Sequence, residues 1–197
     1  MTLLWVDLLQ GGINMSDNQL LKKYPYAFLN SESIAYMDLD EEQIEEYCFS
    51  EELPAGWVDL FWMCIEELYE PLKEADMLHT FHFLQVKEKY GGMCLYSNRA
   101  TAEINDIISK YEYLSQFVCE DCGKPAEVQT CGWIENLCED CFEKSNPNCK
   151  ANKIKLDLHP VIIRFSPDHR EEIPHDYTET WNAYLKRLKK KKNVGRR

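Results

Sequence analysis

The chain has 197 residues, of which 45% are hydrophobic and 12% aromatic, so it is long enough to bury one hydrophobic core and a small appended module. Its formal net charge is −12 at pH 7, and a body of that sign repels the phosphates of DNA and RNA. The composition therefore predicts a chain that folds on its own and argues against a protein that binds nucleic acid over its whole surface.

The N-terminal segment MTLLWVDLLQGGIN is the candidate targeting sequence. Its apolar stretch is short, is interrupted by Asp7 and follows no Lys or Arg, which fits neither a signal peptide nor a membrane-spanning helix. No later run is apolar enough to span a bilayer, so we expect a soluble cytoplasmic protein with no membrane partner. Met15 precedes polar residues, which leaves open whether translation starts at Met1 or at Met15.

Residues 38–53 form an acidic segment that holds eight Asp or Glu and no Lys or Arg. One interpretation is a solvated face that keeps the protein soluble. The other is a surface that imitates nucleic acid or docks on a basic protein partner. The candidate residues of such a partner surface are Glu41, Glu42, Glu45 and Glu46.

Residues 56–72 place apolar side chains at the spacing of an amphipathic helix, which we expect in the core. Two extended runs come next, in residues 81–98, joined by Gly91 and Gly92, which suit a two-residue hairpin turn. If these glycines form the loop, Tyr90 pairs with Met93. One face of the hairpin then carries Leu84, Val86, Tyr90, Met93 and Leu95.

The opposite face of the predicted hairpin carries Gln85 together with basic and aromatic residues. Arg99 lies just beyond the second strand and extends this group. Two interpretations remain open for this group, a plain solvated sheet face and a binding surface. The candidate binding face consists of Lys87, Lys89, Tyr96 and Arg99.

A second helix is predicted for residues 101–118, whose apolar stripe runs directly into Cys119. We therefore expect this helix to pack as one unit with the adjoining cysteine module.

The chain has nine cysteines, an odd number without an export signal, which favours metal binding over a disulfide framework. Four of them have the spacing C-x2-C-x15-C-x2-C, in which each pair presents two sulfurs to one ion and four thiolates complete the tetrahedron that zinc prefers. We expect these four to hold a structural Zn2+; the alternatives are a redox pair and an iron–sulfur site. The predicted ligands are Cys119, Cys122, Cys138 and Cys141.

The shape of this module depends on the segment after the second pair. A helix there would resemble a treble clef, which we favour, whereas a continuing hairpin would make a zinc ribbon. Cys131 and Cys149 are expected to lie outside the coordination sphere. The segment between the two pairs has no histidine, which argues against the His-Asn-His nucleases that share the treble clef.

The predicted fold class is α+β, with an antiparallel hairpin packed on helices and a four-cysteine zinc module. We expect a lead-in at 1–37, an α+β core at 38–118, the zinc module at 119–149 and a C-terminal strand and helix segment at 150–197. That last segment ends in eight bases within residues 186–197. This basic tail comes after an amphipathic helix and binds the acidic body, RNA or a partner, or else is solvated.

The sequence offers little for catalysis. Five histidines are scattered, none beside a Ser or Cys in a nucleophile motif, and no phosphate-binding glycine loop comes after a strand. We therefore expect no enzyme, and keep a diverged nuclease or hydrolase as an alternative.

A Gly-Trp pair opens the first predicted helix, QVKEKYGG precedes a strand that bears an aromatic residue, and the second helix leads into Cys-x-x-Cys-Gly, with a Trp before the second Cys pair. The residues of this pattern are Gly56, Trp57, Gln85 to Gly92, Leu95, Tyr96, Cys119, Cys122, Gly123, Trp133, Leu137, Cys138 and Cys141. Through these residues the chain, over about residues 56–142, resembles a family of small proteins encoded by phages, prophages and bacteria. The resemblance implies a fold and a phage or mobile-element setting, without a reaction.

We therefore expect a zinc-stabilised binding protein that acts on a host protein partner, such as a defence or regulatory factor. The alternative is a nucleic-acid-binding module that uses the candidate binding face and the basic tail. Their dependence on salt distinguishes these two, because binding to phosphates weakens steeply as salt rises.

Overall fold

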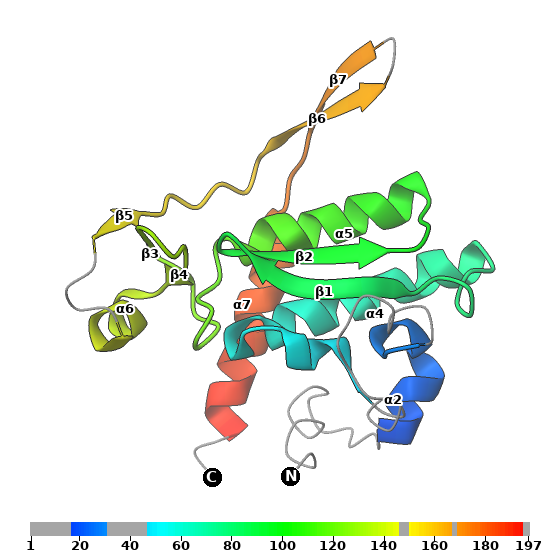
Figure 1. Ribbon diagram of the computed structural model, residues 1–197, viewed down its shortest axis with the longest axis horizontal. Helices are drawn as coiled ribbons and strands as arrows, with labels where there is room; N and C mark the ends of the chain where they lie inside the picture. Colours follow the sequence, from blue (N-terminus) through cyan, green and yellow to red (C-terminus); the bar gives the residue numbers. More distant parts are fainter. Residues whose placement is uncertain (1–16, 31–46, 146–149, 167–168, 195–197) are drawn as a thin grey trace.

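A computed structural model of the chain describes residues 17–30, 47–145, 150–166 and 169–194 (Figure 1). The helices are α2 (Asp17–Lys23), α4 (Val58–Glu74), α5 (Ala102–Ser115), α6 (Glu139–Ser145) and α7 (Thr178–Val194). The short 3-10 helices among these residues are η1 (Pro25–Ala27), η3 (Phe49–Glu52) and η4 (Ala55–Trp57).

Within the described part of the chain, the strands form three small antiparallel sheets, of order β1-β2, β4-β3-β5 and β6-β7. They are β1 (Phe83–Lys89), β2 (Gly92–Ser97), β3 (Val128–Thr130), β4 (Asn136–Leu137), β5 (Ala151–Lys153), β6 (Val161–Ser166) and β7 (His169–Pro174). This mixture of helices and antiparallel strands confirms the predicted α+β class.

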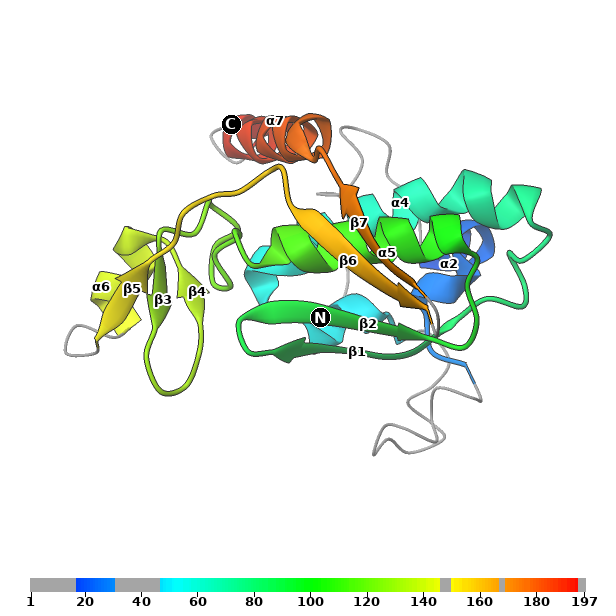
Figure 2. The same cartoon turned by 90° about the horizontal axis from the view of Figure 1, so that it is seen from above.

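The core lies between α4, α5 and the β1–β2 hairpin, with α7 packed against α4 (Figure 2). The predicted apolar stripe of the first helix is confirmed, since every one of its residues is buried. They are Trp57, Leu60, Phe61, Cys64, Ile65, Leu68 and Leu72. Trp181 and Tyr184 of α7 are buried in the same cluster.

The predicted loop of the β1–β2 hairpin is wrong by one residue, and the predicted pairing of the strands is therefore wrong by two. Lys89 pairs with Gly92, so Tyr90 and Gly91 form the loop, and Val86 pairs with Leu95. Both loop residues have positive φ angles, 54° and 74°, as a type I′ turn requires, because its twist matches that of the strands. The side chain of Tyr90 is therefore 74% exposed instead of packed on the core face.

The predicted core face of the hairpin is also wrong at Leu84, because β1 contains an irregularity. The register shifts between Phe83 and Gln85, so Phe83 is buried while Leu84 is only partly buried. Val86, Met93 and Leu95 are buried as predicted.

Helix α5 closes the outer edge of β2. The backbone N–H of Met93 donates to Ser115 Oγ at 2.8 Å, and that of Leu95 donates to Glu112 Oε1 at 2.6 Å. These two bonds satisfy edge groups that would otherwise need water or another strand.

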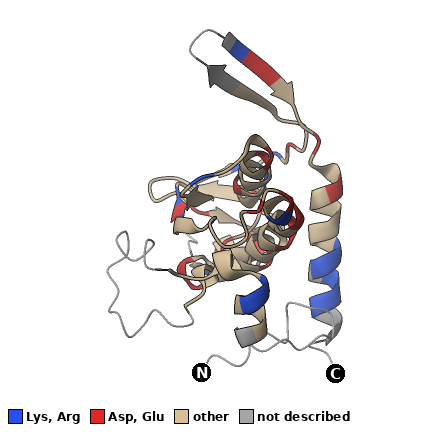
Figure 3. Cartoon of the chain, turned by 90° about the vertical axis from the view of Figure 1, so that its right-hand side faces the viewer, with Lys and Arg blue, Asp and Glu red and all other residues tan. Residues whose placement is uncertain are grey.

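Ion pairs hold α7 against α4. Lys191 Nζ lies 2.7 Å from Asp59 Oδ1, and Arg187 Nη1 lies 3.0 Å from Glu66 Oε2. Figure 3 shows Lys and Arg gathered on the C-terminal part of α7. Two bases of the predicted basic tail therefore contact the acidic body, which is one of the options that the sequence left open.

The acidic candidate partner surface is not part of this description, because Glu41, Glu42, Glu45 and Glu46 lie outside the described residues. Among the described helices, none is long and apolar enough to cross a membrane.

Candidate metal centre

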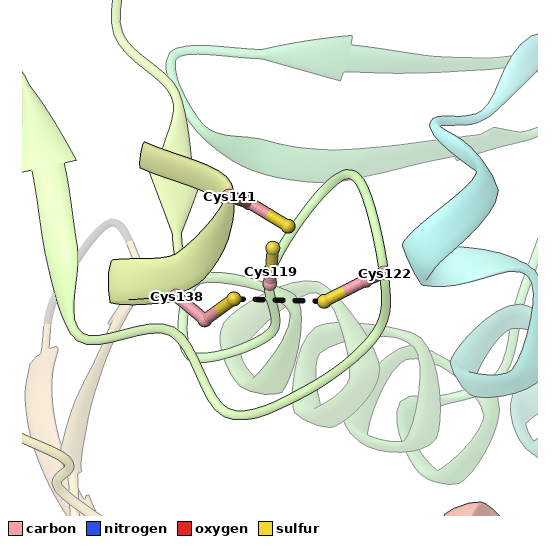
Figure 4. Close-up of side chains that lie close together, drawn as sticks. All are labelled: Cys119, Cys122, Cys138 and Cys141. Carbon is pink, nitrogen blue, oxygen red and sulfur yellow. Dashed lines mark hydrogen bonds between the residues drawn. The ribbon is translucent and has the colours of Figure 1, made fainter. Parts of the chain in front are cut away.

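The four predicted ligands lie together. The Sγ atoms of Cys119, Cys122, Cys138 and Cys141 are all within 4.8 Å of one another (Figure 4), and those of Cys122 and Cys138 are 3.6 Å apart. Four sulfurs at about 2.3 Å from a tetrahedral ion are separated by roughly 3.8 Å. The cluster therefore fits a metal ion bound by four thiolates.

The first pair lies in a tight turn, residues 119–123, that comes after α5. The N–H of Gly123 donates to the carbonyl of Cys119 at 2.9 Å, and the φ angle of Gly123 is +72°. A side chain would strain this left-handed conformation, and a Cβ there would lie 2.9 Å from the carbonyl oxygen of Gly56. Glycine at 123 thus allows the turn to present both sulfurs and to approach the core.

The second pair lies where β4 ends and α6 begins. Cys138 directly follows Leu137, and Cys141 lies in the first turn of α6 (Glu139–Ser145), where Phe142 N–H donates to the Cys138 carbonyl at 3.0 Å. The helix predicted at the second pair is therefore present.

The thiols of the first pair differ in their pKa. Burial raises the pKa of the Cys119 thiol to about 11. Burial would also raise the pKa of Cys122, but hydrogen bonds from the Lys124 backbone N–H and from the other thiols lower it below its usual value. A metal ion binds thiolates, so its binding must release protons from this cluster.

The turn of the first pair is attached to the start of α4. The indole N–H of Trp57 donates to the Val118 carbonyl at 2.9 Å, and the N–H of Gly56 donates to the Glu120 carbonyl at 2.7 Å. A Cβ on Gly56 would lie 2.0 Å from the Cys119 carbonyl oxygen. The absence of a side chain at 56 is what permits this approach.

A second attachment joins the cysteine module to the β1–β2 turn. The side-chain amide of Asn136 donates to the Gly91 carbonyl at 2.6 Å, while the Asn136 N–H donates to Glu120 Oε1 at 2.7 Å. Burial raises the pKa of the Glu120 carboxyl to about 7. Neither Asn136 nor Glu120 was predicted from sequence, because a buried polar pair leaves no signal in hydrophobic periodicity.

The candidate binding face is assembled in part. Lys87 Nζ lies 5.2 Å from the centre of the Tyr96 ring and donates to Gln85 Oε1 at 2.6 Å. Lys89 instead lies over the ring of Tyr90, at 5.4 Å. Arg99 is exposed beyond the end of β2.

Two aromatic side chains on neighbouring turns are largely exposed. Tyr90 is 74% exposed and Trp133 is 79% exposed, and they lie on the β1–β2 turn and the β3–β4 connection, which touch where Gly91 meets Ile134 and Asn136. We call Tyr90, Tyr96 and Trp133 the aromatic surface. All three belong to the resemblance pattern, but no feature of the pattern indicates that their side chains are exposed.

No family model, curated protein or solved structure matches the chain.

Proposed function

We propose that the protein is a non-enzymatic binding protein in which a structural zinc ion fixes a docking surface for a protein partner. Zinc is the ion that a closed set of four thiolates favours. With all four positions filled by protein, such an ion supplies folding energy and leaves no site for substrate or water. The order of turn, hairpin and helix around the cysteines supports a treble-clef module.

The position of the described histidines supports a role without catalysis. His159 Nδ1 lies 3.5 Å from Asp176 Oδ1, but both side chains are about two-thirds exposed, at 68% and 66%. His175 lies against the ring of Tyr177, and His82 lies beside Asn98. A histidine that acts in acid–base catalysis must be positioned beside a reacting group, and these pairs lie on open surface or against structural side chains.

The observation that carries the proposal is the exposure of Tyr90 and Trp133 on a rigid support. A Tyr at a positive φ angle is conformationally unfavourable, and this one gains little packing in return, because its ring is 74% exposed. Exposed Trp and Tyr are enriched at the centres of protein interfaces, where they provide most of the binding energy. The Asn136 bond to Gly91 fixes the turn, which lowers the entropy lost on binding.

The kind of partner comes from the resemblance of residues 56–142 to phage and prophage proteins. The resemblance implies a setting in the cytoplasm of a bacterial host, so we propose a host protein, such as a defence or regulatory factor, as the partner. The carboxylates of Glu41, Glu42, Glu45 and Glu46 would add electrostatic attraction to a basic partner.

The test is affinity capture from bacterial lysate with mass spectrometry, using the wild-type protein and the double variant Tyr90→Asn, Trp133→Ser. Asn is favoured in the first position of a type I′ turn, so this change removes the ring without disturbing the hairpin. The control is Leu156→Ser, which removes an exposed apolar side chain, 42% exposed, from another part of the surface. We expect one protein captured by the wild type and the control and lost with the double variant. Equal capture by all three would reject the aromatic surface as the docking site.

A second candidate function is binding of single-stranded nucleic acid. It is favoured by the lysines that lie over aromatic rings, Lys87 over Tyr96 and Lys89 over Tyr90, since stacked bases and phosphates are bound by such groups. Affinity for a labelled oligonucleotide that falls steeply between about 50 and about 200 mM salt, as expected of phosphate contacts, would favour this candidate. A partner protein bound with little salt dependence would exclude it.

A further inference from the structure

The β6–β7 hairpin extends away from the body as a two-stranded ribbon (Figure 1, Figure 3). At its base, His175 N–H donates to the Pro160 carbonyl at 2.9 Å, and Tyr177 N–H donates to the Leu158 carbonyl at 2.8 Å. Ile162 packs against the main core. An isolated two-stranded ribbon is at best marginally stable in water, so the distal part of this hairpin lacks the usual support of a third strand or a covering helix.

The base of the ribbon determines which backbone groups point outward. In an antiparallel pair, hydrogen-bonded positions alternate with positions whose N–H and C=O groups face away from the partner strand. The bond between His175 and Pro160 makes the pair of Ile162 with Ile173 hydrogen-bonded as well. Val161, Ile163 and Phe165 therefore direct their N–H and C=O groups away from β7. Within the described residues, no further strand pairs with β6.

The outer edge of β6 has the properties of a strand edge that can bind a further strand. Val161 is 56% exposed and Ile163 is 41% exposed, and β-branched residues favour strand pairing. Arg164 is the single charged residue in the strand VIIRFS. Open, apolar edges of this kind are templates for another strand, and proteins usually protect them with charges or proline.

The outer edge of β7 is protected in that way. Its outward positions are Arg170, Glu172 and Pro174, and Pro174 has no N–H to donate. Arg170 and Glu172 are both exposed and form an ion pair at 2.8 Å. The two edges of one ribbon therefore differ, and β6 is the one open to pairing.

We propose that the outer edge of β6 pairs antiparallel with β6 of a second copy of this chain, forming a four-stranded sheet about a twofold axis. The axis passes between Ile163 and Ile163 of the second copy, so Val161 lies opposite Phe165 of the second copy, and the outward groups on both strands find partners. With this axis, the outward N–H and C=O groups of β6 match those of the same strand in the second copy. A twofold interface requires such self-complementarity. Since the ribbon projects from the body, the two bodies need not collide.

Charge selects this pairing over the alternatives. With Ile163 on the axis, Arg164 lies opposite Ile162 of the second copy, and no like charges face each other. A symmetric pairing of β7 with β7 of a second copy, centred on the middle of the strand, would place either Glu171 or Glu172 directly opposite the same residue of that copy. Outside the sheet, each copy carries a net charge of −12, so the two bodies repel, and screening by salt should strengthen the dimer.

The experiment is sedimentation equilibrium of the full chain with its metal, over a range of protein concentrations. Ile163→Pro removes an N–H on the outer edge of β6 and leaves the bonds to β7 intact. Its matched control is Glu172→Pro, which removes the N–H directly opposite, on the outer edge of β7. Both variants resemble Pro174, which β7 already accepts, and unchanged metal content and melting temperature verify that each one folds.

We expect a dimer for the wild type and for Glu172→Pro, and a dissociation constant raised at least about tenfold in Ile163→Pro, which loses both bonds of the central pair. Raising salt from about 50 to about 500 mM should tighten the wild-type dimer, because the Debye length shortens as salt rises. A wild type that is still monomeric at about 100 µM would overturn the proposal, because a specific dimer requires a tighter dissociation constant. A dimer that survives Ile163→Pro, or that is lost equally in both variants, would also overturn it.

Discussion

The hydroxyl of Tyr184 in α7 donates a buried hydrogen bond of 2.6 Å to the carbonyl of Gly123, the residue directly after the first cysteine pair. This bond joins the C-terminal helix to the turn that presents Cys119 and Cys122. Together with the bonds from Gly56 and Trp57, it joins the turn of the first cysteine pair to α7 and to the start of α4. The stability of the centre and the packing of α7 are therefore coupled.

The first prediction removes this bond. Tyr184→Phe should lower the free energy of unfolding by about 1–2 kcal/mol, because the buried Gly123 carbonyl loses its donor, and the melting temperature by roughly 2–6 °C for a chain of this size. The control is Tyr177→Phe, since the buried Tyr177 hydroxyl has no hydrogen-bond partner among the described residues. The melting temperature of Tyr177→Phe should equal that of the wild type or be slightly higher. A loss of equal size in both variants would contradict the role given to the Gly123 bond.

The second prediction concerns the close approach at Gly56. Gly56→Ala would place a Cβ 2.0 Å from the Cys119 carbonyl oxygen, so the turn must move away from α4, at a cost of about 3 kcal/mol or more. We expect a lower melting temperature and weaker metal retention during dialysis against a chelator. In Gly92→Ala the new Cβ meets its nearest atom at 3.6 Å, and this variant should behave like the wild type. Normal metal retention by Gly56→Ala would show that the approach is not required.

The helices and the cysteine cluster were predictable from sequence because both depend on local spacing. The stripe from Trp57 to Leu72 has the 3.6-residue period of a helix, and Cys119, Cys122, Cys138 and Cys141 have the spacing of a four-sulfur site. Neither inference requires knowledge of which distant residues meet.

The hairpin turn and the attachments of the cysteine module were not predictable in the same way. Glycine pairs suggest a loop, but whether Gly91 is the first or the second loop residue depends on the pairing of whole strands. The contact of Asn136 with Gly91 joins residues 45 positions apart, and that of Tyr184 with Gly123 joins residues 61 positions apart. Such bonds are fixed by tertiary packing and leave no periodic signal in the sequence.

The third prediction concerns the metal. The purified protein should carry about one zinc ion per chain, and Cys138→Ser should lose most of it and melt at a lower temperature, because metal binding and folding are coupled. Cys131→Ser is the control, since Cys131 is exposed and lies outside the cluster. Elemental analysis and thermal unfolding measure both effects. A Cys138→Ser protein with full zinc content would contradict the four-sulfur assignment.

The fourth prediction concerns the ion pairs of α7. The Asp59 side chain is 8% exposed and lies near both Arg187 and Lys191. Arg187→Met should lower the free energy of unfolding by about 1–3 kcal/mol, less than the full loss of a buried pair because Lys191 remains. Lys189→Met, an exposed position on the same helix, should change it by no more than about 0.5 kcal/mol. Urea unfolding of the two variants measures the difference, and equal values would show that Arg187 acts only as a solvated charge.

The last prediction uses Glu112, whose Oε1 accepts the Leu95 N–H at 2.6 Å. Burial raises the pKa of this carboxyl above its ordinary value of 4.5, and the hydrogen bond from Leu95 offsets only part of that effect. As pH rises from 4.5 toward the raised pKa, the unfolded chain releases its proton first. The native state then holds more protons than the unfolded state, so the stability contributed by Glu112 decreases across this window.

Glu112→Gln keeps an oxygen that can accept the Leu95 N–H and removes the charge. The variant should therefore be more stable than the wild type at about pH 7, and this advantage should shrink as the pH falls toward 4.5, because the native carboxyl takes up its proton at a higher pH than the unfolded one. Urea unfolding at several pH values measures the difference between the two proteins, in which the pH dependence of the metal centre cancels because both contain it. If the difference between Glu112→Gln and the wild type does not vary with pH, burial against β2 does not raise the pKa of the Glu112 carboxyl.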